Sequence, residues 1–154
     1  MISIQNEDFS VGDEYVAIRT RAGDVGAIVT FTGLVREIYG DDSTAGAVQS
    51  LTIEHYPGMT EKCLKDIQLK AEDRWPLLAT RIIHRVGELC NHDQIVLVAT
   101  ASAHRNAAFE SAEFIMDYLK SEAPFWKKQK SESESSWIES RYTDKAALDR
   151  WQKS

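Results

Sequence analysis

Four short apolar segments, each about as long as a β-strand, constrain the fold of this chain more than any other feature. They are rich in β-branched residues, and turn-forming or polar residues separate them. The segments span residues 26–35, 48–56, 80–89 and 93–102. The last two are joined by a gap of hairpin length. Strands linked in this way pair antiparallel, so the pattern favours an α+β fold over a doubly wound sheet.

Two longer segments among these strands show the periodicity of amphipathic helices. One helix is expected over residues 59–75, ending at Trp75 because a residue before proline disfavours the helical conformation. A second is expected over 106–121 with Asn106 as its N-cap, and a short one over 143–152. The stripes expected to face the core are Cys63, Leu64, Ile67 and Ala71 in the first helix, and Ala108, Ala112, Ile115 and Leu119 in the second.

Two polar stretches are predicted to be loops. Residues 36–47 follow the first strand and are rich in Gly, Asp and Ser. Residues 130–136, "KSESESS", have low complexity and should form a flexible loop. Because no repeat or linker divides the chain, residues 1–154 are expected to form a single domain.

The charge balance limits the partners of this chain. It carries 24 Asp and Glu against 18 Lys and Arg, a net charge of -6. A general nucleic-acid binder needs a broad basic surface, so we expect no nucleic-acid partner, although a small cationic pocket is still allowed. No apolar run approaches the ~20 residues that span a bilayer, and the start lacks the basic and apolar regions of a signal peptide. We therefore expect a cytoplasmic protein without a membrane partner.

The familiar catalytic and metal-binding motifs are absent from the sequence. Cys63 and Cys90 are far apart and form no CxxC pair, so neither a zinc site nor a disulfide framework is indicated. The sequence also contains no phosphate loop, GxGxxG, GxSxG or HExxH element. Function must therefore be sought among scattered cations.

Three cations lie at the junctions of the predicted elements. Arg36 follows the first strand, where loops commonly hold ligand groups; the alternative is a surface arginine that closes a hairpin. His104 and Arg105 precede the second helix, whose free N–H groups and dipole favour an anion. A cation is unfavourable there, so the pair makes most sense if an anion is shared. A solvent-exposed junction is the alternative.

A lysine group follows the same helix. Lys120 lies near its C-terminus, where lysines are common because they suit the helix dipole. Lys127 and Lys128 come after Pro-Phe-Trp, which gives Lys127 an apolar neighbour and can fold it back towards Lys120. Two amines in a partly dry pocket lower each other's pKa, so that one becomes a usable base or nucleophile. The competing interpretation is that these lysines are solvent-exposed residues without a role in function.

Helix geometry separates these groups. Lys120 follows Arg105 by fifteen positions, which is about 22 Å along an unbroken helix. A small ligand cannot touch both ends. Either there are two sites, or the helices of two subunits bring opposite ends to one site. We expect the second arrangement, because a two-fold dimer generates such a shared site twice.

Five segments, in this order and spacing, resemble the catalytic large subunit of molybdopterin synthase. They are "TFTGLVRE", "LTIEHYPGMTEK", "IIHRVGEL", "SAHRNAAFESAEFIMDYLK" and "APFWKK". The resemblance extends from about Phe9 to Trp151. The combination of "EHYPGM", "AHR" and "APFWK" is highly specific to that family.

The resemblance implies a fold, a reaction and partners. The fold is of the α+β hammerhead type, with helices packed on a mixed or antiparallel sheet. The chain would form a homodimer within a heterotetramer that includes a small ubiquitin-like sulfur-carrier subunit. The carrier's Gly-Gly thiocarboxylate tail would supply two sulfurs to cyclic pyranopterin monophosphate, giving molybdopterin. Because sulfur arrives on the carrier, no metal, other cofactor or cysteine nucleophile is expected.

The resemblance also assigns residues. Lys120 and Lys127 match catalytic positions near the carrier tail: Lys120 would act as a general base or stabilise an oxyanion, and Lys127 would hold the tail. Part of the anion-binding set would come from the second subunit. The substrate-binding positions implied are Arg36, His104, Arg105, Lys128, Arg141, Leu34, Val35 and Gln129.

Two of these positions depart from the family pattern, and two other functions compete. Family members often carry Glu where this chain has Gln129, and some carry Lys where it has Leu34. These departures bear on the detailed roles of the two positions and not on the resemblance to the family. A non-enzymatic adaptor for the tail of a ubiquitin-like partner would also explain the lysines. An RNA binder that stacks bases on Phe125 and Trp126 is disfavoured by the acidic balance.

Overall fold

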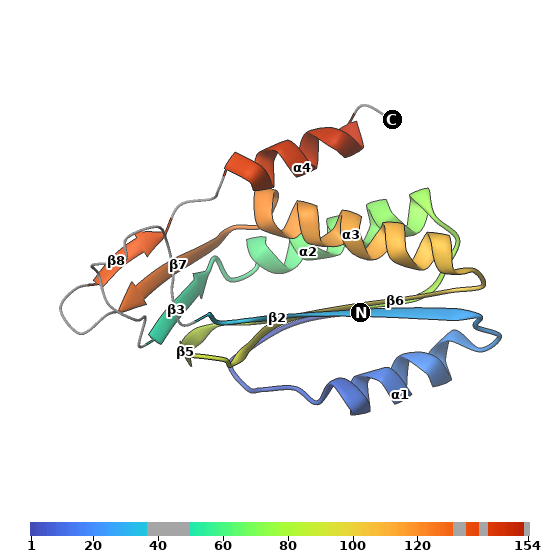
Figure 1. The fold of residues 1–154 in the computed structure, drawn as a ribbon, viewed down its shortest axis with the longest axis horizontal. Helices are drawn as coiled ribbons and strands as arrows, with labels where there is room; N and C mark the ends of the chain where they lie inside the picture. The colour runs from blue at the N-terminus through green and yellow to red at the C-terminus, as the bar shows by residue number, and fades with distance from the viewer. Residues whose placement is uncertain (37–49, 131–134, 139–141, 153–154) are drawn as a thin grey trace.

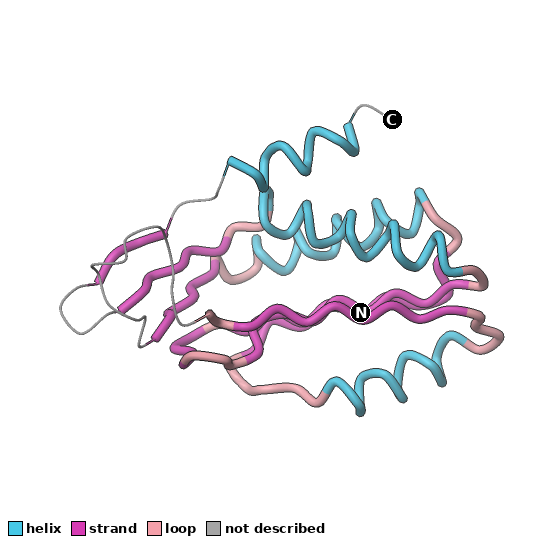
Figure 2. Tube along the Cα trace, in the orientation of Figure 1, coloured by secondary structure: helices cyan, strands magenta, loops and turns pink. Residues whose placement is uncertain are grey.

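The computed structural model describes residues 1–36, 50–130, 135–138 and 142–152. Strands and helices are interspersed along the chain, which confirms the predicted α+β class (Figures 1 and 2). In chain order the elements are β1 (Ile2–Gln5), α1 (Val11–Ala22), β2 (Ala27–Leu34), β3 (Ser50–His55), α2 (Met59–Arg74), β4 (Leu77–Arg85), β5 (Gly87–Cys90), β6 (Gln94–Ser102), α3 (Arg105–Glu122), β7 (Phe125–Lys130), β8 (Ser135–Ile138) and α4 (Tyr142–Gln152).

A four-stranded sheet, here called sheet A, forms the centre of the molecule, with strand order β1-β4-β6-β2. Only the β1–β4 pair of these neighbours is parallel. Helix α1 covers one face of the sheet, and α2 and α3 cover the other (Figure 1). The central strand β6 is buried from Ile95 to Ser102. It lies between two helical layers, which explains why its sequence is apolar at nearly every position.

The two faces of β6 pack against different helices because side chains alternate along a strand. Val96 and Val98 belong to the main core with α2 and α3. On the opposite face, Ala99 and Ala101 pack against Ile18 of α1. Small side chains at these strand positions let α1 lie close to the sheet.

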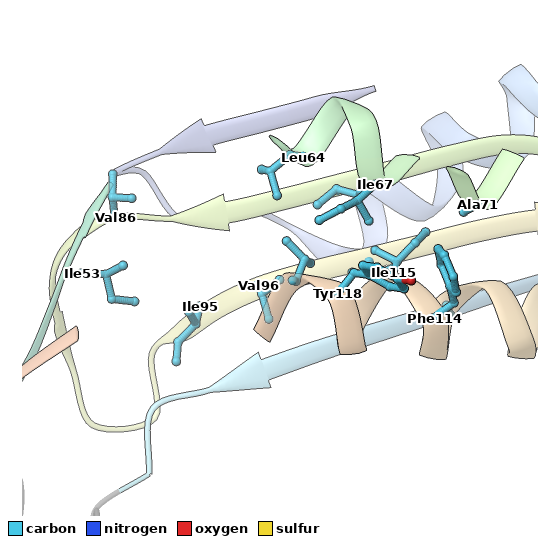
Figure 3. Packing of buried hydrophobic residues seen from close by; sticks show 14 of the residues in the cluster. Ile53, Leu64, Ile67, Ala71, Val86, Ile95, Val96, Phe114, Ile115 and Tyr118 are labelled. Carbon is cyan, nitrogen blue, oxygen red and sulfur yellow. The ribbon is translucent and has the colours of Figure 1, made fainter. Parts of the chain in front are cut away.

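Helices α2 and α3 bury the stripes that their periodicity predicts. Leu64 and Ile67 of α2 meet Ile115 and Tyr118 of α3 above the sheet (Figure 3). Burying a leucine or isoleucine side chain contributes about 1.5–3 kcal/mol, so this layer is a principal source of stability. Thr100 adds a buried hydrogen bond, donating its hydroxyl to the carbonyl of Ala108 at 2.7 Å.

A second four-stranded sheet, sheet B, has the order β5-β3-β7-β8, and all of its pairs are antiparallel. It projects from one end of the helical layer, which we call the sheet B end of the molecule (Figure 1). Its strands come from three distant parts of the sequence, so sheet B joins the middle of the chain to its C-terminal third.

Two local predictions were wrong. Helix α3 begins at Arg105 with His104 as its N-cap, not at Asn106, because the chain stays extended through His104 (φ -131°, ψ 150°). Residues 130–136 are not one loop: Lys130 ends β7 and Ser135 starts β8, and the two pair directly. Polar side chains do not prevent this pairing, since the ladder uses backbone groups. Residues 131–134 lie outside the described part of the chain.

Most of the other predicted elements agree with the structure within a few residues. The segments 26–35, 48–56 and 93–102 correspond to β2, β3 and β6, and the predicted helices correspond to α2, α3 and α4. The segment 80–89, predicted as one strand, is instead divided between β4, which ends at Arg85 in sheet A, and β5, which begins at Gly87 in sheet B. The loop predicted over residues 36–47 lies outside the described residues apart from Arg36. Within the described part of the chain, no helix is long and apolar enough to cross a membrane.

Candidate active site

The unbroken length of α3 divides the predicted site residues into two groups. Because α3 is one helix from Arg105 to Glu122, Arg105 and Lys120 stay about 22 Å apart along its axis. The chain reverses between β6 and α3, so α3 packs back along β6 and β2. The C-terminal end of α3 therefore lies at the sheet B end, and its N-terminal end lies at the opposite end of the molecule (Figure 1).

Arg36 belongs to the sheet B end. It follows β2, whose last residues pair with the beginning of β6. Val35 is buried, its N–H donates to Asp93 O at 2.9 Å, and its carbonyl accepts from His92 N at 2.7 Å. Val35 therefore anchors the backbone, while the side chains of Leu34 and Arg36 are exposed.

His104 and Arg105 lie at the far end of the molecule. They follow the end of β6, whose eight steps from Gln94 to Ser102 cover about 27 Å. Both side chains are exposed, and the side chain of His104, the N-cap residue, makes no capping hydrogen bond with the first turn of α3. The structure therefore presents a histidine and an arginine beside helix N–H groups, far from Arg36 of the same chain.

The register of sheet B orients Lys127. In the β3–β7 pair, Phe125 lies opposite His55 and Lys127 lies opposite Ile53. Directly opposed residues share one face of a sheet, and Ile53 is buried in the main core. Lys127 is thus half-buried on the inner face, and only Ala123 and Pro124 separate its strand from the helix that carries Lys120.

Lys128 projects from the opposite face of the same strand. It pairs with Thr52, and its neighbour Trp126 pairs with Glu54. Successive side chains of a strand point to opposite faces, so the structure separates Lys128 from Lys127. Trp126 is 47% exposed on this outer face. Gln129 pairs with Leu51 in the register of the same strands.

A buried histidine supports the inner face of sheet B. The ring of His84, on β4, stacks on Phe125 with ring centroids 3.7 Å apart and an interplanar angle of 14°. Its Nδ1 lies 2.8 Å from the carbonyl oxygen of Arg85. A carbonyl can only accept, so Nδ1 carries the proton. The stack joins the central sheet to the strand that carries Lys127.

The surroundings of His84 keep its ring neutral. Burial lowers the pKa of His84 to about 4, and the charges of Lys127 and His55 also lower it. The hydrogen bond to Arg85 opposes this shift. His84 lies on β4 and has a local hydrogen-bond partner in the carbonyl of Arg85. Its contact with Phe125 was missed, because no spacing in the sequence links residues so far apart.

The cysteines and Arg141 complete the set of predicted residues. Cys63 is half-buried on α2, and burial, helped by the charge of Glu122, raises the pKa of its thiol. A raised pKa disfavours the thiolate and hence nucleophilic attack. Cys90 is exposed at the end of β5. Arg141 lies outside the described residues.

Comparisons with known proteins agree on one family. The family model described as MoaE protein matches residues 4–122. The molybdopterin synthase catalytic subunit of Vibrio cholerae is 52% identical over 151 residues, which cover 98% of this chain and 97% of the relative.

Solved structures give the same result. The molybdopterin biosynthesis MoaE protein of Burkholderia ambifaria superposes with a TM-score of 0.83 at 47% identity, covering 99% of this chain and 97% of that one. The crystal structure of molybdopterin synthase from Staphylococcus aureus gives a TM-score of 0.78 at 33% identity, covering 88% and 95%. The similarity therefore extends over nearly the whole chain in both sequence and fold.

Proposed function

The chain belongs to the MoaE family, and from that premise we propose that it is the sulfur-transferring subunit of a molybdopterin synthase. Its substrate is cyclic pyranopterin monophosphate, and its sulfur donor is the thiocarboxylated C-terminus of a small ubiquitin-like carrier subunit. The relatives are named catalytic subunits, a name that implies an enzyme with at least one further subunit. The proposed product is molybdopterin, with two new carbon–sulfur bonds.

The lysines at the sheet B end carry the chemistry in this proposal. The thiocarboxylate sulfur forms a bond to a pterin carbon as an oxygen substituent leaves that carbon, which links the carrier to the pterin through an acyl–sulfur bond. Water then adds to the acyl carbon to give a tetrahedral oxyanion, whose collapse leaves the sulfur on the pterin as a thiolate and releases the carrier as a carboxylate. Lys120 stabilises this oxyanion or accepts a proton, and Lys127 holds the anionic tail from the inner face of β7. Arg36, at the same end, binds anionic groups of the pterin.

A second copy of the chain completes the site. Within one chain, His104 and Arg105 lie at the opposite end of α3 from Lys120. In the proposed homodimer, these two residues of one protomer approach the lysines of its partner, within a heterotetramer that holds two carriers. The exposed cations at a helix N-terminus then share the pterin phosphate, which is the group that such an end binds best.

The observation that carries the proposal is the orientation of Lys127. The register places this lysine, and not Lys128, on the core-facing side of sheet B, beside the turn that leads from Lys120. Both lysines are half-buried, but only Lys127 lies on the side of the apolar core, where an anion interacts more strongly with a positive charge than it does in water. An extended Gly-Gly tail is narrow enough to reach such a position.

Reconstitution with defined components tests the proposal. The purified chain is incubated with thiocarboxylated carrier in excess and cyclic pyranopterin monophosphate, and molybdopterin is measured over time. We expect several turnovers per chain, and none with a carrier that ends in an ordinary carboxylate. Tight carrier binding without conversion of the pterin would instead support the adaptor function.

A further inference from the structure

The turn between α3 and β7 is held by a set of hydrogen bonds that the proposed chemistry does not itself require. This turn, residues 122–124, contains three consecutive carbonyl groups at and just beyond the C-terminal end of α3. Helix ends leave such carbonyls without intrahelical partners. Here each one has a partner: Glu122 O accepts from Cys63 Sγ at 3.6 Å, Ala123 O from Phe125 N at 2.9 Å, and Pro124 O from Thr60 Oγ1 at 3.1 Å.

Thr60 is the strongest of these anchors. Its side chain is fully buried at the start of α2, and its hydroxyl also accepts from Tyr56 N at 3.0 Å. The hydroxyl of Thr60 therefore links the turn before α2 to Pro124, which lies 64 residues after Thr60 in the sequence. Cys63, three residues later, lies on the same side of α2, but a thiol is only a weak donor.

The other side of the turn is held by His84. Its ring stacks on Phe125, the first residue of β7. The hydroxyl of Thr60 from α2 and the imidazole of His84 from β4 thus fix consecutive residues of the same segment, Pro124 and Phe125. Two anchors on adjacent residues leave the turn little freedom to rotate or slide.

This turn connects the two proposed catalytic lysines. Lys120 lies four residues before Pro124, and Lys127 lies three residues after it. We propose that Thr60, assisted by the His84–Phe125 stack, is a positioning residue that sets the separation of Lys120 and Lys127. The inference rests on the proposed sulfur transfer, in which a misplacement of about 1 Å can lower the rate about a hundredfold.

The test compares Thr60→Val with Thr60→Ser. Valine keeps the shape and removes both hydrogen bonds, whereas serine keeps the hydroxyl. Four properties are measured for each: the single-turnover rate of sulfur transfer, the Kd for thiocarboxylated carrier, the KM for the pterin, and the melting temperature. We expect the rate of Thr60→Val to fall about tenfold or more, with the carrier Kd and pterin KM within about threefold of wild type. Thr60→Ser should recover to within about threefold of the wild-type rate.

The outcomes distinguish a role of Thr60 in positioning the lysines from a role in fold stability alone. The proposal is overturned if folded Thr60→Val transfers sulfur at the wild-type rate, or if the valine and serine variants are slowed equally. If Thr60→Val does not fold, His84→Asn, which loses the stack, is compared with His84→Phe, which retains a ring. A slower rate for the asparagine variant supports the proposal, and equal rates overturn it. Failure of the proposed function would show separately, as absence of transfer by the wild-type protein.

Discussion

The two ends of α3 carry cations in opposite physical settings. At the C-terminal end, Lys120 complements the helix dipole and leads into a turn that is fixed by hydrogen bonds. At the N-terminal end, His104 and Arg105 oppose the dipole and are exposed. The helix dipole alone accounts for a lysine in the first setting, whereas basic residues in the second are unfavourable unless an anion is bound beside them. In the proposed function, the N-terminal end therefore binds an anion, and the C-terminal end provides the ordered half of the site.

The largest effect is expected at the C-terminal end. Lys120→Ala should lower the single-turnover rate of sulfur transfer at least a hundredfold, because a general base or an oxyanion-stabilising cation contributes about that much. Carrier binding should change far less. A Lys120→Ala variant with a near-normal rate would rule out both proposed roles.

Neighbouring lysines on β7 sharpen this expectation. Lys127→Ala should slow transfer at least tenfold, and Lys128→Ala no more than about threefold, because the two side chains leave the strand on opposite faces. Rates are compared at saturating carrier and pterin. Equal losses in the two variants would contradict the proposed role of the inner face.

Substitutions at the N-terminal end of α3 should change pterin binding more than the rate of sulfur transfer. Arg105→Ala should raise the KM for the pterin about tenfold or more, since a hydrogen bond to a charged group contributes about 1.5–3 kcal/mol. The melting temperature should stay constant or rise slightly, because a cation is removed from the positive end of a helix. Arg105→Lys serves as the matched control and should show a smaller increase in KM. A fall in melting temperature without a change in KM would make Arg105 a structural residue.

Acid should destabilise the fold through His84. Its pKa is about 4 in the folded protein against 6.5 for an exposed histidine, so the unfolded chain binds the extra proton first as the pH falls. The free energy of unfolding should therefore drop between pH 6.5 and pH 4, by about 3 kcal/mol. Phenylalanine does not titrate, so the free energy of unfolding of His84→Phe should fall by about 3 kcal/mol less than that of the wild type over this pH range. Denaturant unfolding at a series of pH values measures both. Identical pH profiles for the two proteins would contradict this account of the buried ring.

The smallest effects are expected at the cysteines. Cys63→Ala and Cys90→Ala should both retain sulfur transfer, because sulfur arrives on the carrier and neither thiol is placed as a nucleophile. Cys90 is exposed, so its loss should change the free energy of unfolding by less than about 0.5 kcal/mol, and Cys63→Ala by about 1 kcal/mol. Loss of turnover with the fold preserved, in either variant, would reveal an active-site thiol.

The sequence predicted the elements of this fold better than their pairing. The run at β6 was recognisable because a strand buried on both faces is apolar throughout, and the stripe of α3 followed from helical periodicity. Strand β7 was missed, since "FWKKQK" has no strand alternation of its own and is defined by its partner β3. Strand β1 and helix α1 were also not predicted, although Ser10 caps α1 by accepting from Asp13 N.

The same limit applies to the candidate site. The separation of Arg105 from Lys120 followed from residue count and helix rise alone, and the structure keeps it. The placement of Lys127 and Lys128 on opposite faces could not be predicted from the sequence, because it depends on the register between strands about 70 residues apart in sequence. The anchoring of Pro124 by Thr60 is likewise a contact between distant turns.

Complementation between two impaired variants tests most directly whether facing protomers share the site. Lys120→Ala and Arg105→Ala chains are co-expressed with different tags, and the mixed dimer is isolated and assayed with carrier at a pterin concentration near the wild-type KM. If sites are shared, one site of the mixed dimer has both mutations and the other has neither, so activity should recover to about half that of wild type. If each chain provided its own complete site, the mixed dimer would be no more active than the average of the two mutant homodimers, and the account of a shared site would be wrong.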